Sequence, residues 1–146
     1  YNCSIIFEPG RAIVGNTAIL VSKVQYLKKG SNKTFVILNA GMNDFMRTAL
    51  YDAVHNVIPI IKNLKKNKGT LEFVGPICET TCKFIKYRKY QKINQSDYVA
   101  IADVGAYGAS LSSNYNTKPL IAEIIVSKTK ARVIRKKQDI KNLLNQ

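Results

Sequence analysis

Residues 12–39 read AIVGNTAILVSKVQYLKKGSNKTFVILN and indicate the fold class more directly than any other segment. Isoleucine, valine, leucine and small residues dominate 12–27, and polar residues alternate with apolar ones toward its end. This pattern predicts a long strand over 12–27, bent near Gly15-Asn16, because period-two alternation is typical of a half-buried strand and a glycine within one marks a bend. The lysine-rich segment 28–33 then predicts a hairpin-like turn, and 34–39 predicts the returning strand.

Most of the other predicted elements are also strands. Asn43-Asp44 predicts the start of a helix that runs to residue 53, because apolar residues follow at helical spacing. Short apolar runs bounded by turn residues predict strands at 3–7, 70–74 and 98–102, a hairpin of 122–126 with 131–135, and a closing helix at 140–144. This succession predicts a mainly β fold, a β-rich sandwich or barrel-like domain with one or two short helices.

Length and composition predict one folded domain. The chain has 146 residues, of which 46% are hydrophobic and 22% charged, close to the average of globular proteins. It has no apolar run of the length needed to cross a bilayer and no export leader. A cytoplasmic protein without a membrane partner is therefore expected. The first residue is Tyr1 rather than Met, inside an expected strand, which predicts a cut, a processed end or a fragment boundary there.

The ionisable residues give two weaker signals. Three cysteines, Cys3, Cys78 and Cys82, and a single histidine, His55, lack the spacing of a metal site, so reduced thiols and no metal are expected. The formal charge of +14 raises the alternative of a nucleic-acid-binding β domain, placed over residues 128–141. That run has no interleaved aromatic residues for base stacking, so a solvated basic face and no nucleic-acid partner are expected.

Six motifs, in this order along nearly the whole chain, resemble the C-terminal blocks of the diaminopimelate decarboxylases. They are Glu8-Pro9-Gly10-Arg11-Ala12-Ile13-Val14-Gly15-Asn16, Asn39-Ala40-Gly41-Met42-Asn43-Asp44, Arg47-Thr48-Ala49-Leu50-Tyr51-Asp52, Val74-Gly75-Pro76-Ile77-Cys78-Glu79, Gly105-Ala106-Tyr107-Gly108 and Ser112-Ser113-Asn114-Tyr115-Asn116. Each motif alone is a weak signal, whereas six in register are a specific one.

The resemblance implies a subunit of two domains. One is an N-terminal (β/α)8 barrel that holds pyridoxal 5'-phosphate on a lysine, and the other is a C-terminal β domain similar to that of alanine racemase. Residues 1–11 would be the last barrel strand, residues 12–146 the β domain, and the cofactor lysine would lie in the barrel half, outside this chain. The resemblance also implies a homodimer whose subunits share their active sites.

The implied reaction is the decarboxylation of meso-2,6-diaminopimelate to L-lysine, a step of lysine biosynthesis. The resemblance assigns Glu8, Pro9, Gly10, Arg11 and Tyr107 to the cofactor. Glu8 would keep the ring nitrogen protonated and electron-poor, while the bare backbone at Gly10 and the hydroxyl of Tyr107 would approach the phosphate.

A second set of residues is assigned to substrate binding and to proton donation. The resemblance assigns Arg11, Arg47, Tyr51, Glu79 and Tyr107 to the substrate, and Cys78 to catalysis. Arginines suit the carboxylates because guanidinium donates two parallel hydrogen bonds, Glu79 would accept the distal ammonium, and Cys78 would give a proton to the carbon that has lost carbon dioxide.

Departures from the family pattern keep alternatives open. Thr80-Thr81-Cys82 stands where Ser-Gly-Asp is usual, Thr48 follows Arg47 in place of proline, and Ser96 stands where glycine is usual. They are compatible with a folded remnant that has no activity, and without the cofactor lysine this chain alone is expected to be inactive. An ornithine- or arginine-type decarboxylase is the other alternative, but Glu79 together with Arg47 favours diaminopimelate.

Overall fold

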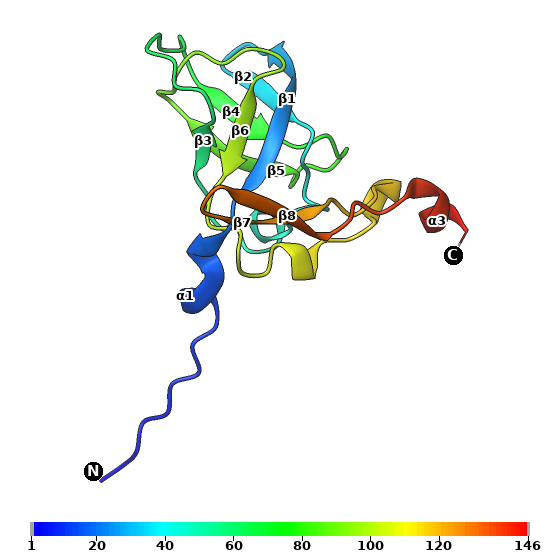
Figure 1. Cartoon of the computed structure of the whole chain (residues 1–146). Helices are drawn as coiled ribbons and strands as arrows, with labels where there is room; N and C mark the ends of the chain where they lie inside the picture. Colours follow the sequence, from blue (N-terminus) through cyan, green and yellow to red (C-terminus); the bar gives the residue numbers. More distant parts are fainter. Residues whose placement is uncertain (1, 146) are drawn as a thin grey trace.

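One six-stranded sheet, with strand order β3-β6-β1-β2-β4-β5, forms the body of the chain in a computed structural model that describes residues 2–145 (Figure 1). A separate two-stranded sheet pairs β7 with β8. In chain order the elements are α1 (Arg11–Val14), η1 (Gly15–Thr17), β1 (Leu20–Lys29), β2 (Thr34–Leu38), α2 (Arg47–Leu50), β3 (Val57–Pro59), β4 (Leu71–Val74), β5 (Lys83–Tyr87), β6 (Tyr98–Ile101), η2 (Ala109–Leu111), η3 (Tyr115–Thr117), β7 (Glu123–Ser127), β8 (Lys130–Arg135) and α3 (Ile140–Leu144). The predicted mainly β class with a few short helices is confirmed.

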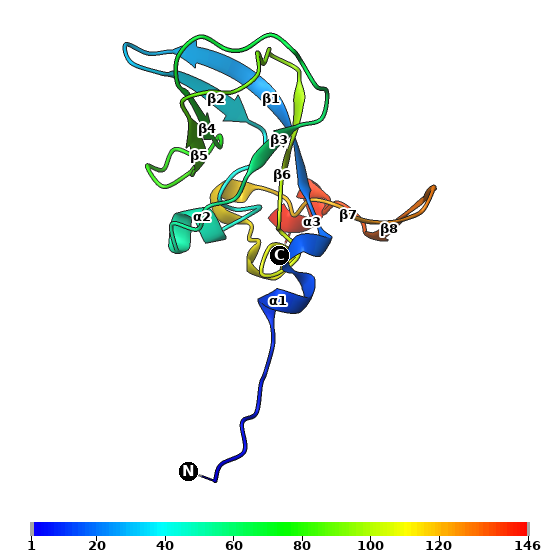
Figure 2. The same cartoon turned by 90° about the vertical axis from the view of Figure 1, so that its left-hand side faces the viewer.

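Strand β1 lies at the centre of the sheet. It runs antiparallel to β2 on one side and to β6 on the other, while β2 and β4 are parallel. The sheet curls, and α2, α1 and the loops that follow β6 gather at one end of it (Figure 2). This end carries the residues that the sequence singled out.

The core lies on the concave side of the curled sheet. Its fully buried side chains come from alternate positions of the central strands and include Val24, Val36, Leu38, Val99 and Ile101. Phe73 joins them and packs edge-on against Tyr87 and Tyr90, with ring centroids 6.0 and 5.1 Å away. Period-two burial in β1 and β2 is therefore the physical basis of the alternation seen in the sequence.

The N-terminal part of the predicted strand 12–27 is wrong. Residues 11–17 form α1 and η1, and the strand begins only at Leu20. The backbone N–H of Ile13 donates to the carbonyl of Gly10, and the Thr17 hydroxyl donates to the carbonyl of Val14. These local bonds replace ladder bonds because no neighbouring strand pairs with this segment among the described residues.

The helix predicted from Asn43-Asp44 to residue 53 is mostly wrong as well. Only α2 is helical, because the Asp44 carboxylate accepts from the N–H of Gly41, behind it, and closes a turn instead of capping a helix. Asp52 then takes a left-handed backbone (φ 48°), which ends any continuation. His55, expected at the end of that helix, is instead buried beyond it, with Nδ1 2.9 Å from the carbonyl of Ala102.

Residues 2–10 form no strand in this chain and extend away from the body (Figure 1). Their side chains are exposed, and a strand needs a hydrogen-bonding neighbour, so the expected barrel strand at 3–7 stays a prediction. Tyr1 lies outside the described residues.

The strands predicted at 34–39, 70–74 and 98–102 and the final hairpin and helix are confirmed. Two strands were missed. β5 was interpreted as a lysine- and tyrosine-rich connection, and β3 has only three residues and ends in Pro59, a residue that edge strands tolerate. None of the helices within residues 2–145 has the length and apolarity that spanning a membrane requires.

Candidate active-site residues

The sequence-predicted site residues fall into two clusters, which we call the arginine cluster and the cysteine cluster. The arginine cluster consists of Gly10, Arg47, Tyr51 and Tyr107. The Arg47 guanidinium lies between two rings, 5.6 Å from the ring centroid of Tyr51 and 5.5 Å from that of Tyr107. Such cation–π contacts contribute about 0.5–1 kcal/mol each at exposed sites and hold the planar group in one orientation. Within this cluster Nε of Arg47 is buried and has no hydrogen-bond partner.

Close backbone packing sets the position of Tyr107. A side chain on Gly105 would meet the carbonyl oxygen of Val14 at 1.9 Å, and one on Gly108 would meet that of Val104 at 2.4 Å. The N–H of Gly105 donates to the carbonyl of Gly15. Two glycines without side chains therefore allow this turn to press against η1, and Tyr107 leaves it with a left-handed backbone (φ 59°).

The same turn brings Tyr107 to Gly10. A Cβ atom built on Gly10 would lie 3.3 Å from the Tyr107 hydroxyl oxygen, so the hydroxyl points at the bare backbone of that residue. These two groups, 97 positions apart in the chain, are the ones that the sequence assigned to a phosphate. The structure thus brings together two of the predicted cofactor residues.

The cysteine cluster consists of Cys78, Glu79 and Tyr115. Cys78 and Glu79 are exposed in the turn between β4 and β5, and the Tyr115 hydroxyl donates a short hydrogen bond to Oε1 of Glu79. This bond and the nearby negative charge of Glu79 raise the pKa of Tyr115, and the thiol of Cys78 adds to the same effect. A hydrogen bond to the neutral phenol favours that form, which is the physical cause of the direction.

A tight turn fixes the cysteine cluster. The N–H of Gly75 donates to the carbonyl of Cys82, that of Cys82 donates to Glu79, and that of Glu79 donates to Ile77. A side chain on Gly75 would meet the Cys82 sulfur at 2.4 Å. The cysteine that replaces the usual aspartate is therefore buried against this glycine, and it accepts a bond from the N–H of Met42 at 3.4 Å.

The remaining predicted residues lie apart from both clusters. Glu8 and Pro9 are exposed in the extended N-terminal segment, and Arg11 is the first residue of α1, with its side chain lying along Gly15. Within residues 2–145, no hydrogen bond or ion pair joins the arginine cluster to the cysteine cluster.

The sequence analysis gave Tyr115 no role. It stands in the last of the six motifs, and its 36-residue separation from Glu79 hides the pairing. The signal available in the sequence was its membership in a motif that also holds Ser113 and Asn114.

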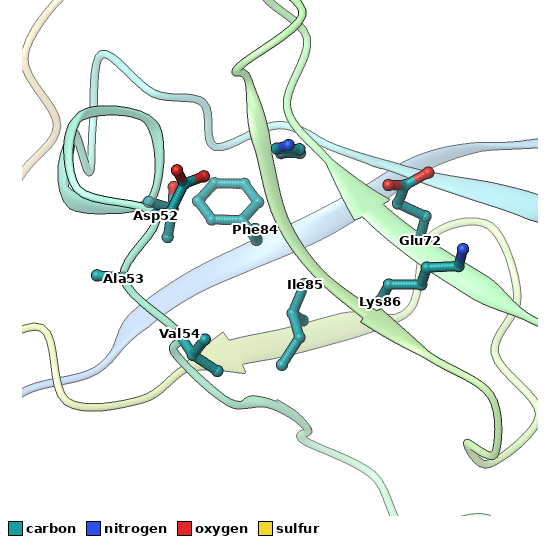
Figure 3. Close-up of a pocket in the computed structure, with 9 residues that line it drawn as sticks. Asp52, Ala53, Val54, Glu72, Phe84, Ile85 and Lys86 are labelled. Atoms are coloured by element: carbon teal, nitrogen blue, oxygen red, sulfur yellow. The ribbon is translucent and has the colours of Figure 1, made fainter.

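A pocket of about 250 Å³ lies between α2, together with the segment that follows it, and the strands β4 and β5. Asp52 lies beside Phe84 at one side, and Glu72 and Lys86 lie on neighbouring strands at the other (Figure 3). Glu72 is ion-paired with Lys33, and none of the predicted site residues lines this pocket. It is therefore separate from the two clusters.

Comparison with known proteins identifies close relatives. The chain is 41% identical over 144 residues to diaminopimelate decarboxylase of Zymomonas mobilis, which covers 99% of this chain and 34% of that protein. It is 44% identical over 139 residues to diaminopimelate decarboxylase of Haemophilus influenzae, which covers 95% of this chain and 33% of that protein. The crystal structure of diaminopimelate decarboxylase from Helicobacter pylori complexed with L-lysine superposes with a TM-score of 0.85 at 40% identity, over 94% of this chain and 34% of that one.

The chain thus spans about a third of the length of the relatives that it matches. Residues 7–105 match the family described as pyridoxal-dependent decarboxylase, C-terminal sheet domain. These residues include both clusters except for Tyr107 and Tyr115, which lie just beyond, within the part aligned to the relatives. Since the match takes in more than half of its residues, the chain belongs to the family of pyridoxal-dependent decarboxylases.

Proposed function

We propose that this chain is the C-terminal part of a diaminopimelate decarboxylase, which converts meso-2,6-diaminopimelate to L-lysine and carbon dioxide. The observation that carries the proposal is the Arg47 guanidinium, held between Tyr51 and Tyr107 with its buried Nε unpaired. A cation held in this way suits a carboxylate. Diaminopimelate has a second carboxylate that does not react, whereas ornithine has none, so Arg47 favours the former.

Glu79 would bind the distal ammonium of the same substrate. Its Oε1 accepts from Tyr115, which fixes the carboxylate while the second oxygen remains an acceptor. Together, Arg47 and Glu79 would bind the amino-acid end that does not react. Such binding selects diaminopimelate because its distal end carries both a carboxylate and an ammonium group, whereas ornithine carries no second carboxylate.

Cys78 would supply the proton that replaces carbon dioxide. It is exposed beside Glu79, and a thiol in hydrogen-bonding reach of the reacting carbon can act as a general acid. Its neighbour in the chain, Glu79, would hold the substrate so that the reacting carbon faces the sulfur. Removal of the thiol is therefore expected to lower kcat.

The described residues fit pyridoxal phosphate at one end. A Cβ atom on Gly10 would lie 3.3 Å from the Tyr107 hydroxyl oxygen, so the glycine leaves the space beside that hydroxyl free for a phosphate, to which the phenol would donate. When bound, the cofactor supplies an electron-poor ring that takes up the electron pair released with carbon dioxide. Glu8, Pro9 and Arg11 are proposed to approach the cofactor once the N-terminal segment packs against a barrel.

We place the two clusters in different active sites of a homodimer. Support comes from their separation, because no hydrogen bond or ion pair within residues 2–145 connects them, and from the exposure of Cys78 and Glu79 at a turn. The Cys78-Glu79 turn would then complete the active site of the second copy. The free thiols of Cys78 and Cys82 agree with an enzyme of the cytoplasm, where cysteines stay reduced.

The test is lysine formation from meso-diaminopimelate with added pyridoxal phosphate. The chain is assayed alone and together with a (β/α)8 barrel that carries the cofactor lysine, and the expected result is activity only in the combination. Cys78→Ala is expected to lower kcat by about 10²–10⁴-fold, as loss of a general acid does. Arg47→Ala is expected to raise KM by about 10–100-fold, the value of a hydrogen bond to a charged group.

Arg132→Ala serves as the matched control, because this arginine is exposed on β8, outside both clusters. It is expected to leave both kinetic constants unchanged. A folded combination that is inactive would indicate an inactive remnant and overturn the proposal. A combination that decarboxylates ornithine or arginine in preference to diaminopimelate would overturn the substrate assignment alone.

A further inference from the structure

A turn of buried polar groups, residues 41–45, connects the chain segments that carry the arginine cluster and the cysteine cluster. Asn43 is 1% exposed and Asp44 9%, values that are unusual for these residue types. Oδ2 of Asp44 accepts from the N–H of Gly41 at 2.9 Å, and Oδ1 accepts from Nδ2 of Asn43 at 3.1 Å. Backbone bonds from Asp44 and Phe45 to the carbonyl of Gly41 close the turn. Both carboxylate oxygens therefore hold this turn in one shape.

The turn presses on the chain just before the cysteine cluster. A Cβ atom on Gly41 would lie 3.1 Å from both Pro76 and Ile77, and one on Gly75 would lie 2.7 Å from the Cα of Gly41. Ile77 immediately precedes Cys78 and is itself buried. The position of the Cys78-Glu79 turn is thus set by direct packing against Gly41.

The same turn also binds the loop that carries Tyr115. The carbonyl of Asn43 accepts from the N–H of Ser113 at 2.9 Å, and the Ser113 hydroxyl accepts from the N–H of Tyr115. One residue, Asn43, therefore contacts the carboxylate of Asp44 with its side chain and the Tyr115 loop with its backbone. On its C-terminal side the turn leads through Met46 directly into α2, whose first residue is Arg47.

We propose that Asp44 is a positioning residue for both active sites to which this chain contributes, and that it acts through Gly41 and Asn43 to keep Glu79 and Tyr115 in hydrogen-bonding distance and Arg47 at its place. The inference rests on the proposed function for its catalytic consequence, but the positioning itself is a property of this chain. Displacements of about 1 Å in such groups are enough to cost a hundredfold in rate.

The first test measures the ionisation of Tyr115 in the 146-residue chain, by NMR of tyrosines labelled with carbon-13 at Cζ, with the Tyr115 signal assigned from Tyr115→Phe. In the wild type, the pKa of Tyr115 is expected to lie above the ordinary value for tyrosine, because its hydroxyl donates to the negatively charged Glu79. In Asp44→Ala the pKa of Tyr115 is expected to fall toward the ordinary value, because Glu79 and Tyr115 are no longer held in hydrogen-bonding distance. An unchanged Tyr115 titration in folded Asp44→Ala overturns the proposal.

Asp97→Ala is the matched control. Asp97 accepts from the N–H of Asn94, three residues before it, at 2.7 Å, just as Asp44 accepts from Gly41, but it lies at the turn before β6. Tyr115 is expected to titrate unchanged in this variant. Should Asp44→Ala fail to fold, Asp44→Glu takes its place, since it keeps both acceptors but displaces them by one methylene and should lower the Tyr115 pKa in the same direction.

The second test measures kinetics in the combination with the barrel. Asp44→Ala is expected to raise KM for diaminopimelate by about tenfold or more with a smaller change in kcat, whereas Asp97→Ala changes neither by more than about twofold. A KM that stays at the wild-type value while the Tyr115 titration moves overturns the link between positioning and substrate binding. If the wild-type combination is inactive, the proposed function has failed, and the Tyr115 titration still decides the positioning role.

Discussion

Ser96 has a left-handed backbone (φ 71°), a conformation that costs a residue with a Cβ atom about 1–2 kcal/mol. Glycine, the residue that the family resemblance leads us to expect at this position, adopts that conformation without strain. The N–H of Ser96 donates to the carbonyl of Val24, and Asp97 accepts from Asn94, so the turn is held from both sides. These hydrogen bonds hold Ser96 in the left-handed conformation despite the local strain.

Ser96→Gly is expected to raise the free energy of unfolding by about 0.5–1 kcal/mol, since relief of strain outweighs the added flexibility of the unfolded chain. Thermal or urea unfolding of the chain would measure it. Ser112, at φ −68°, provides the contrast, because glycine there relieves nothing and removes a hydroxyl that donates to Ala109, so stability should fall. A loss of stability in Ser96→Gly would contradict the assignment of strain.

Burial of Asp44 raises the pKa of its carboxyl, against the opposing effects of the Gly41 hydrogen bond, the Lys118 ammonium and the Asn43 amide. The folded chain therefore keeps a proton on Asp44 at pH values where the unfolded chain has lost it. Stability then falls as the pH rises from the ordinary value of 3.8 through the raised pKa, because the native state binds more protons in that window.

Asp44→Asn does not titrate, so the difference in melting temperature between wild type and this variant isolates the effect. This difference, wild type minus variant, is expected to decrease as the pH rises through that window and to level off above it. Melting curves recorded by circular dichroism over a series of pH values provide the measurement. A difference that stays flat or grows with pH would show that burial does not dominate at Asp44.

Among the elements, β6 joins the central strand β1 to the edge strand β3. It pairs with β1 on one side and with β3 on the other, and Ile101, at 0% exposed, meets Leu20 and Val57 in register. The hairpin of β7 and β8 differs from it, because its sheet is separate and Ile124 is 57% exposed. Equal side chains in the two elements should therefore differ in energetic importance.

Ile101→Ala is expected to lower the free energy of unfolding by about 2–5 kcal/mol, through lost burial and the cavity left behind. Ile124→Ala, the same change on β7, is expected to cost less than about 0.5 kcal/mol, as at other surface positions. Urea unfolding of both variants gives the comparison. Similar losses in the two variants would show that the hairpin packs against the body more tightly than its exposure indicates.

The sequence predicted elements well where buried apolar residues follow one another in a paired strand, and poorly where local hydrogen bonds determine the backbone. The buried residues of β2, β4 and β6 are all apolar, and these strands were predicted within a residue or two at each end. β5 was missed because Lys83 and Lys86 face solvent on a strand with one buried side chain, Phe84. The segment from Ala12 to Val14 has the composition of a strand, but no strand within residues 2–145 pairs with it, and it forms part of α1.

At the scale of the whole molecule, the sequence predicted which residues matter better than how they meet. The contact of Arg47 with Tyr51 follows from the sequence, because the two residues are four positions apart within the predicted helix. The contact of Gly10 with Tyr107 and the bond of Tyr115 to Glu79 join segments far apart in the chain, which periodicity cannot reveal. The turn of residues 41–45 was likewise not predicted, because Asp44 was interpreted as a helix cap, a position that aspartate favours.

The central place of β1 has a consequence for synthesis on the ribosome. Its first partner, β2, follows at once, but its second, β6, is about 80 residues further along the chain, and at ~5–20 residues per second it emerges roughly 4–16 s later. During that interval one edge of β1 offers unpaired N–H and C=O groups to any other nascent strand. The central strand of the finished sheet is thus also a strand whose edge stays unpaired during synthesis and that chaperones are expected to protect from other nascent chains.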